Sequence, residues 1–158
     1  PDVLHWRFGP RTTPDDARSL FELRRAIEPT AGALAAERAT QEQIDELRAI
    51  LAEMERAGDD GERFAVPDLA FHRAILHMSG NELIGSLAAL IETALVISFR
   101  LSDDNPAGQS HSLAMHRQIV ENIARRDPAA TSKALVALLD GAEEDVRLSL
   151  ASRQGGSR

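Results

Sequence analysis

Apolar residues recur at spacings of three and four along almost the whole chain, and this period constrains the fold more than any other feature. Such a spacing places side chains on one face of an α-helix, whereas a half-buried strand needs apolar residues at every second position. No segment shows a convincing period of two. The expected fold class is therefore all-α, an antiparallel bundle of six to seven helices joined by short turns.

Capping residues and chain breaks divide the pattern into separate helices. Thr13 with Asp16 and Thr40 with Gln43 have the spacing of capping boxes, which start helices. Clusters of Gly, Pro, Ser, Asp and Asn predict breaks near residues 58–61, 79–81 and 103–106. Pro67 either bends the third helix or starts a new one. We expect helices at about 14–38, 40–57, 62–78, 81–101, 108–125 and 127–152.

The sequence predicts one domain between two short extensions. Residues 1–13 contain Pro and Gly without a helical period and predict a linker, residues 14–152 form the domain, and residues 153–158 are expected to be a flexible tail. A chain of 158 residues can bury a core without covalent staples. It contains no cysteine, which excludes a disulfide framework and thiolate chemistry.

Charge and hydropathy narrow the possible partners. The net charge of -7 and the pI near 5.2 argue against a nucleic-acid-binding surface on this chain, because phosphate contacts need an excess of Lys and Arg. The longest apolar run, 83–101, is interrupted by Gly85, Ser86, Glu92 and Thr93, so we predict no membrane span. No signal-peptide pattern is visible, and we expect a cytoplasmic protein.

Asp68 and His72 lie four residues apart on the face that the third helix turns inward. A carboxylate and an imidazole buried together need a hydrogen-bond partner or a counterion, because an unpaired buried charge is costly. They either hydrogen-bond to each other or chelate one divalent ion. The apolar residues on the same face are Phe64, Phe71, Ile75 and Met78.

His116 directs another imidazole inward, because it shares a helix face with Leu113, Val120 and Ile123. Three possible ligands from two facing helices suit a metal site, since bundle cores often house such sites. A satisfied core histidine is the alternative.

Several stretches of the chain resemble one known family, in the right order and over about residues 20–150. They are residues 20–29 with 34–40, the set Asp68, Phe71 and His72 followed by 79–81, and residues 116–127. These stretches resemble the FCD domain, the ligand-binding half of FadR-branch regulators in the GntR-type family of transcription regulators.

The resemblance implies a sensor domain. Its expected ligand is a small carboxylate bound inside the bundle beside a divalent metal, zinc or nickel. The expected partners are a second copy of the chain and operator DNA, the latter only through a winged helix-turn-helix domain that would precede the linker 1–13. Residues 1–6 further resemble the linker of galactonate-type members, which respond to sugar acids.

The family's usual metal ligands are one Asp and three His, and the resemblance places three of them at Asp68, His72 and His116. Leu138 stands where the third His is expected. The site therefore either holds an ion with three protein ligands plus water or effector, or holds none. Asp140 lies roughly 200° around the helix from Leu138 and is a poor substitute.

Arg24 is the first candidate for binding the effector's carboxylate, because a guanidinium offers two parallel donors. The alternative for Arg24 is a surface pair with Glu28. Arg100 and Ser112 are further candidates for polar contacts to the effector, or else surface residues near helix ends.

Two other classes of function compete with a sensor. A hydrolase or lyase could use a metal at Asp68, His72 and His116, but it would need a general base beside the metal, and the sequence has no phosphate-binding loop or Ser/Cys nucleophile motif. We therefore expect no enzyme. The other class is a metal-free helical dimerisation module. The three inward polar groups argue against it, because a core selected only for packing would have apolar residues at these positions.

Overall fold

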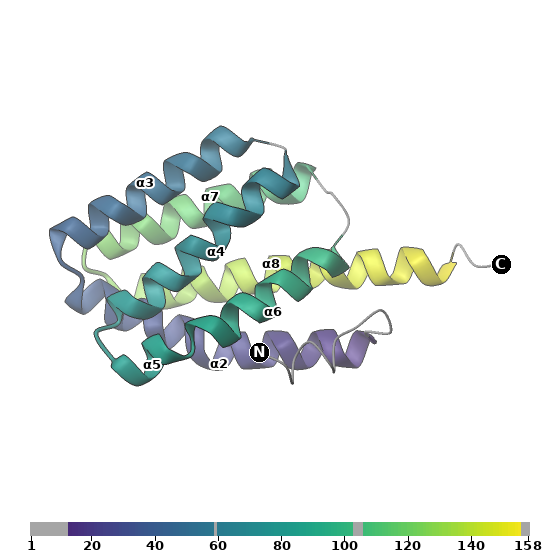
Figure 1. Cartoon of the computed structure of the whole chain (residues 1–158), viewed down its shortest axis with the longest axis horizontal. Coiled ribbons are helices and arrows are strands. Elements are labelled where there is room, and N and C mark those ends of the chain that lie inside the picture. Colours follow the sequence, from purple (N-terminus) through teal and green to yellow (C-terminus); the bar gives the residue numbers. More distant parts are fainter. Residues whose placement is uncertain (1–12, 59, 103–105, 156–158) are drawn as a thin grey trace.

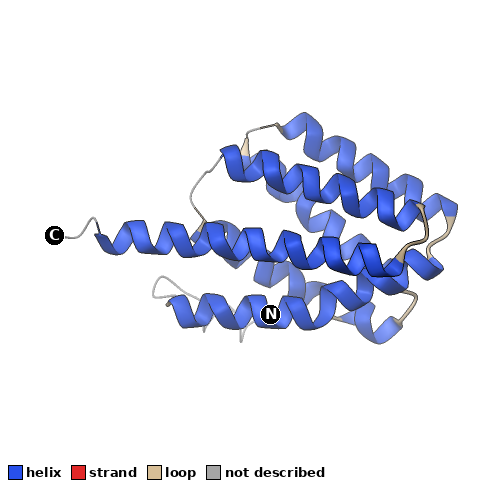
Figure 2. Ribbon diagram, turned by 180° about the vertical axis from the view of Figure 1, so that it is seen from behind, coloured by secondary structure: helices blue, strands red, loops and turns tan. Residues whose placement is uncertain are grey.

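Seven helices account for nearly all of the residues that the computed structural model describes, which are 13–58, 60–102 and 106–155. No strand occurs within these ranges, so the predicted all-α bundle is confirmed (Figure 2). Residues 1–12 of the predicted linker lie outside the described part. The helices are α2 (Pro14–Arg38), α3 (Gln41–Ala57), α4 (Gly61–Met78), α5 (Glu82–Ser86), α6 (Ala88–Leu101), α7 (Pro106–Ala124) and α8 (Pro128–Gly155).

Both predicted capping boxes are present. The Thr13 hydroxyl accepts a hydrogen bond from the Asp16 amide at 3.2 Å, and the Asp16 carboxylate accepts one from the Thr13 amide at 2.9 Å. Thr40 and Gln43 form the same reciprocal pair at 3.2 and 2.9 Å. These bonds satisfy amides that a helix start leaves without intrahelical partners, which fixes where α2 and α3 begin.

In the middle of the chain, one alternative left open at Pro67 is decided and one predicted boundary is wrong. Pro67 lies inside a continuous α4 and does not start a new helix. The single helix expected over 81–101 is wrong, because α5 ends at Ser86 and α6 begins at Ala88. Gly85 weakens the helix there, and the Ser86 hydroxyl donates to the Leu83 carbonyl at 2.7 Å, which competes with the backbone ladder.

The last helix is longer than predicted. It continues to Gly155 and so includes the first three residues of the expected tail 153–158. The preceding helix, α7, starts at Pro106, two residues before the predicted start, because proline is well tolerated in a first helical turn.

The chain runs back and forth through the bundle, as the colours of Figure 1 show. Helix α2 packs along α8, α4 packs against α2, α3 and α6, and α7 packs against α3 and α8. The largest core cluster joins these helices, and a second one links α2, α6 and α8 through residues such as Phe21, Ile97 and Val146. None of the described helices combines the length and apolarity that crossing a membrane requires.

A glycine sets how closely α2 approaches α8. A Cβ atom added at Gly32 would lie 2.2 Å from Cδ1 of Leu135, which is itself fully buried. We predict that Gly32→Ala lowers the free energy of unfolding by about 1–3 kcal/mol, the usual cost of overpacking. Urea denaturation followed by circular dichroism measures this change.

Gly141, within α8, is the matched control. A Cβ there meets only His111, at an ordinary 3.9 Å. Gly141→Ala should therefore raise stability by about 0.5–1 kcal/mol through its helix propensity. Equal shifts in the two variants would show that the α2–α8 approach does not depend on Gly32.

Candidate metal and effector site

A cavity of about 720 Å³ lies inside the bundle, within the range typical of small-molecule sites. Its walls come from α2, α4, α6, α7 and α8. Every residue that the sequence singled out for metal or effector binding lines this one cavity, namely Arg24, Asp68, His72, Arg100, Ser112 and His116. Leu138, at the position of the missing histidine, lines it as well.

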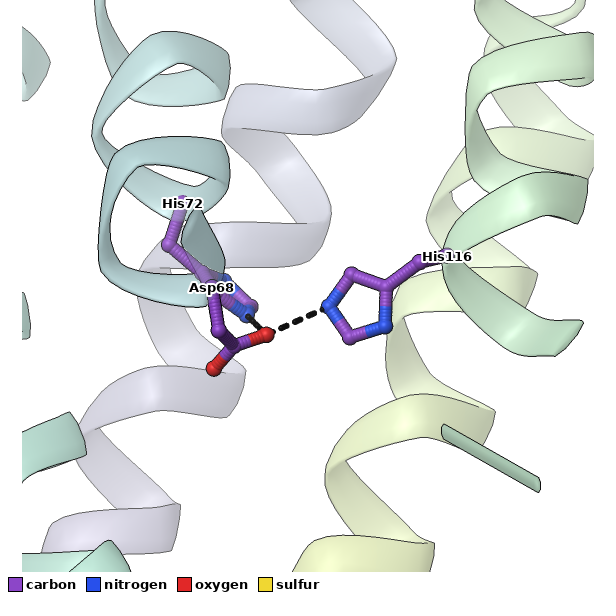
Figure 3. A group of neighbouring side chains, drawn as sticks. All are labelled: Asp68, His72 and His116. Atoms are coloured by element: carbon purple, nitrogen blue, oxygen red, sulfur yellow. Dashed lines mark ion pairs between the residues drawn. The ribbon is translucent and has the colours of Figure 1, made fainter. Parts of the chain in front are cut away.

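Three possible metal ligands meet at one wall of the cavity. Asp68 and His72 project from α4, and His116 faces them from α7, with the carboxylate of Asp68 between the two rings (Figure 3). Oδ1 of Asp68 lies 2.7 Å from Nε2 of His116 and 3.8 Å from Nε2 of His72. One ligand atom from each residue falls within 4.8 Å of the others. All three side chains are buried.

Asp68 and His116 approach each other at the distance of an ion pair. Oδ1 of Asp68 and Nε2 of His116 are both buried and both lack a hydrogen-bond partner among the described residues, although they lie 2.7 Å apart. Buried polar atoms without partners are rare and costly, so this pair needs a further group to satisfy it.

The outer nitrogens of both histidines are held by acceptors. Nδ1 of His116 lies 2.7 Å from the backbone carbonyl of Ser112, which can only accept, so this nitrogen carries the proton. Nδ1 of His72 lies 2.5 Å from a carboxylate oxygen of Glu28. In a neutral ring the proton then sits on Nδ1, and Nε2 presents its lone pair toward Asp68. Such outer contacts orient histidine ligands in metal sites.

Glu28 is the site residue that the sequence interpretation missed. It is completely buried, and its other oxygen accepts a hydrogen bond from Nε of Arg24 at 2.7 Å. A surface pair with Arg24 was the alternative to an effector contact, and the surface location is wrong, since both side chains are at most 2% exposed. A signal was present, because Arg24 and Glu28 share the spacing of three and four with Phe21, Ala31 and Ala35, which are buried.

The buried charges keep the two carboxyl groups ionised. Burial by itself would raise the pKa of Glu28, but the charges of Arg24 and His72 outweigh it and lower that pKa from 4.5 to about 2. Burial acts on Asp68 in the same direction, and His116 above all, with His72 and Arg24, brings the pKa of its carboxyl below the usual value. Asp68 is therefore an anion at neutral pH.

This donor set fits a divalent ion. A carboxylate oxygen and two imidazole nitrogens converge with no hydrogen-bond donor fixed between them, and they are ligands that zinc and nickel accept. Leu138 contributes no fourth ligand, and Asp140 does not replace it, because it is exposed and bonded to Arg25 at 2.7 Å. The remaining coordination positions would open into the cavity.

The other predicted effector residues lie along the same cavity at different depths. Arg24 is bonded through Nε alone among the described residues, so its terminal nitrogens are free for a ligand. Ser112 is half-buried one turn before His116. Arg100 is exposed and lines the cavity together with the exposed His111.

We predict that Glu28→Gln destabilises the chain by about 3–5 kcal/mol, because it leaves the guanidinium of Arg24 buried without its countercharge. Glu22→Gln, an exposed position on the same helix, is the control and should change stability by less than about 0.5 kcal/mol. Urea denaturation of the three proteins measures both effects.

The difference between wild type and Glu28→Gln should depend on pH. The pKa of Glu28 is lowered on folding, so its contribution is complete above pH 4.5 and is lost as the pH falls toward about 2. The difference in unfolding free energy between wild type and Glu28→Gln should be largest at about pH 6 and should become smaller at more acid pH. A gap that stays constant over this window would contradict the buried ion pair.

Comparison with known proteins places these features in a family. The profile of the FCD domain matches residues 19–141. The galactonate operon transcriptional repressor of Escherichia coli is 27% identical over 139 residues, which cover 87% of this chain and 61% of the repressor. The HTH-type transcriptional regulator LutR of Bacillus subtilis is 27% identical over 135 residues, covering 82% of this chain and 62% of LutR. The chain thus spans about three fifths of these relatives.

Solved structures agree with the sequence comparison. Streptococcus agalactiae GntR superimposes with a TM-score of 0.71 at 28% identity, over 81% of this chain and 58% of that one. E. coli McbR/YncC shares the fold, with a TM-score of 0.74 at 19% identity over 90% of this chain and 72% of that one. With the family profile matched over most of its length, the chain belongs to the FCD domain family.

Proposed function

We propose that this chain is the sensor domain of a bacterial transcription regulator and not an enzyme. It binds a small carboxylate in the central cavity, beside a divalent metal, and thereby controls a DNA-binding domain outside this sequence. The observation that carries the proposal is the cavity itself, which brings Arg24 together with Asp68, His72 and His116 inside a helical domain. The relatives' names, a transcriptional repressor and an HTH-type regulator, support it.

Zinc or nickel would be held by Asp68, His72 and His116. The orphaned Oδ1 of Asp68 and Nε2 of His116 support this assignment, since a cation satisfies both atoms. Glu28 and the Ser112 carbonyl keep the two rings oriented. A bound ion would supply positive charge, and the carboxylate of the effector could occupy its open coordination positions. With only three protein ligands, binding of the ion and binding of the effector should reinforce each other.

The terminal nitrogens of Arg24 provide the second contact to the effector's carboxylate. A guanidinium binds a carboxylate through two parallel hydrogen bonds, which sets the ligand's orientation. The Nε bond to Glu28 fixes the side chain in advance, so little conformational entropy is lost on binding. The sequence resemblance favours a sugar acid or a similar small acid as the effector.

The site is suited to transmit binding because its groups lie on different helices. A ligand that bridges Arg24 on α2, the pair on α4 and His116 on α7 stabilises one arrangement of these helices over others. Helix α2 directly follows residues 1–13, the predicted linker to the DNA-binding domain. We propose a homodimer as well, because a two-fold symmetric operator is matched by a two-fold symmetric regulator.

The geometry disfavours a hydrolase or lyase. Glu28 is the carboxylate that touches His72, but its pKa of about 2 makes it a poor general base at neutral pH. The two named relatives above are regulators.

A thermal-shift screen tests the proposal. Sugar acids and other small carboxylates are added to the chain with zinc, with nickel or with a chelator. At least one acid should raise the melting temperature, since a ligand that binds only the folded state stabilises it. The shift should require metal and should disappear in Arg24→Lys and His116→Ala.

Two neighbouring positions serve as controls. Arg25→Lys changes the next residue, whose guanidinium pairs with Asp140 and Glu143 at the surface. His77→Ala removes an exposed imidazole that does not line the cavity, from the same helix as His72. Both should keep most of the ligand-induced shift. An equal shift in the presence of chelator would remove the metal from the proposal, and no shift with any acid would contradict the sensor function.

A further inference from the structure

The composition of the cavity wall carries information about the effector beyond its carboxylate. Between the charged cluster and the exposed end near Arg100, the wall is mostly aliphatic and aromatic, from the three helices α4, α6 and α8. The apolar side chains that matter most are Leu69, Leu95, Val96, Phe99, Leu138 and Val146.

Three polar side chains in this part of the wall already have partners within the protein. The hydroxyl of Ser98 donates to the Ala94 carbonyl at 2.9 Å, and that of Ser102 donates to the Phe99 carbonyl at 3.3 Å. Glu144 is paired with Arg147 at 2.6 Å. A ligand hydroxyl placed here would lose its hydrogen bonds to water and find few in return, which is unfavourable.

The cavity is large enough that its apolar wall contacts most of a bound ligand. Its volume of about 720 Å³ is many times the roughly 30 Å³ that one water molecule occupies in the liquid. The charged cluster and Arg24 therefore contact only one end of a ligand, and the ligand's body contacts the apolar wall. Burying each methylene there is favourable by about 0.8 kcal/mol.

We propose that the effector is a carboxylate with an apolar, hydroxyl-poor body, and that the cavity discriminates against polyhydroxylated acids. This inference rests on the proposed sensor function and narrows its ligand class. The carboxylate lies at Arg24 and the cluster, and the aliphatic or aromatic body lies against α6 and α8. Sugar acids, which the linker resemblance suggested, would then be weak ligands.

Hexanoate and gluconate form a matched pair of probes, because both are six-carbon monocarboxylates and they differ in the hydroxyl groups of gluconate. Isothermal titration of each into the chain, with and without zinc, gives the dissociation constants. Hexanoate should bind at least about tenfold more tightly, since adding hydroxyls to a ligand in an apolar pocket costs affinity. Its binding should also show a negative heat-capacity change.

Two variants test whether hexanoate binds against the apolar wall of the cavity. Val96→Thr keeps the shape of a half-buried wall residue and replaces a methyl by a hydroxyl. It should weaken hexanoate about fourfold, the factor that one buried methylene contributes. Val66→Thr is the control, because Val66 is 70% exposed and does not line the cavity. It should leave the dissociation constant unchanged.

The outcomes separate this inference from the sensor function. Gluconate binding as tightly as hexanoate, with loss in Arg24→Lys, would overturn the apolar-body inference and leave the sensor function standing. Hexanoate binding that Val96→Thr and Val66→Thr affect equally would place the ligand elsewhere and overturn the inference. Failure of both acids here, and of every acid in the thermal-shift screen, would overturn both proposals.

Discussion

A chain of buried charges spans the centre of this bundle, and the rest of the site depends on it. Arg24 bonds to Glu28, Glu28 contacts Nδ1 of His72, and Asp68 lies between His72 and His116. Taking such groups out of water costs several kcal/mol for each ion, so a core selected for stability alone would replace them with apolar residues. Their mutual compensation is incomplete, since Asp68 and His116 each retain a buried atom without a hydrogen-bond partner in the described structure. A bound cation would satisfy both atoms, since each presents a lone pair.

The same arrangement ties the site to the fold. The charges come from α2, α4 and α7, and these helices reach one another because small residues and long apolar stripes let the bundle close around the cavity. Gly32, for example, allows α2 to approach Leu135 of α8. A ligand that changes the balance of charges at the centre therefore changes the relative stability of helix arrangements, which is the physical requirement for a sensor.

Much of this could be predicted from the sequence, and the failures have identifiable causes. The capping boxes at Thr13 and Thr40 and the inward positions of Asp68, His72 and His116 follow from local chemistry and helical period, which the sequence contains in full. The break between α5 and α6 was missed because apolar residues continue at helical spacing on both sides of the glycine and the serine that interrupt the helix. Glu28 was missed because a carboxylate is normally placed on the solvent side, and only the three-dimensional neighbourhood shows that Arg24 and His72 compensate its burial. The apolar character of the cavity wall was also not foreseen, since it is assembled from several helices.

Anomalous diffraction from crystals grown with zinc or nickel tests the role of the buried cluster most directly. We expect one anomalous peak inside the bundle, about 2.0–2.2 Å from Nε2 of His72, Nε2 of His116 and an oxygen of Asp68. The peak should disappear in Asp68→Asn, whose side chain has nearly the same shape. A structure with no peak at this position at saturating metal, or with peaks only at surface histidines such as His77, would contradict that role of the cluster.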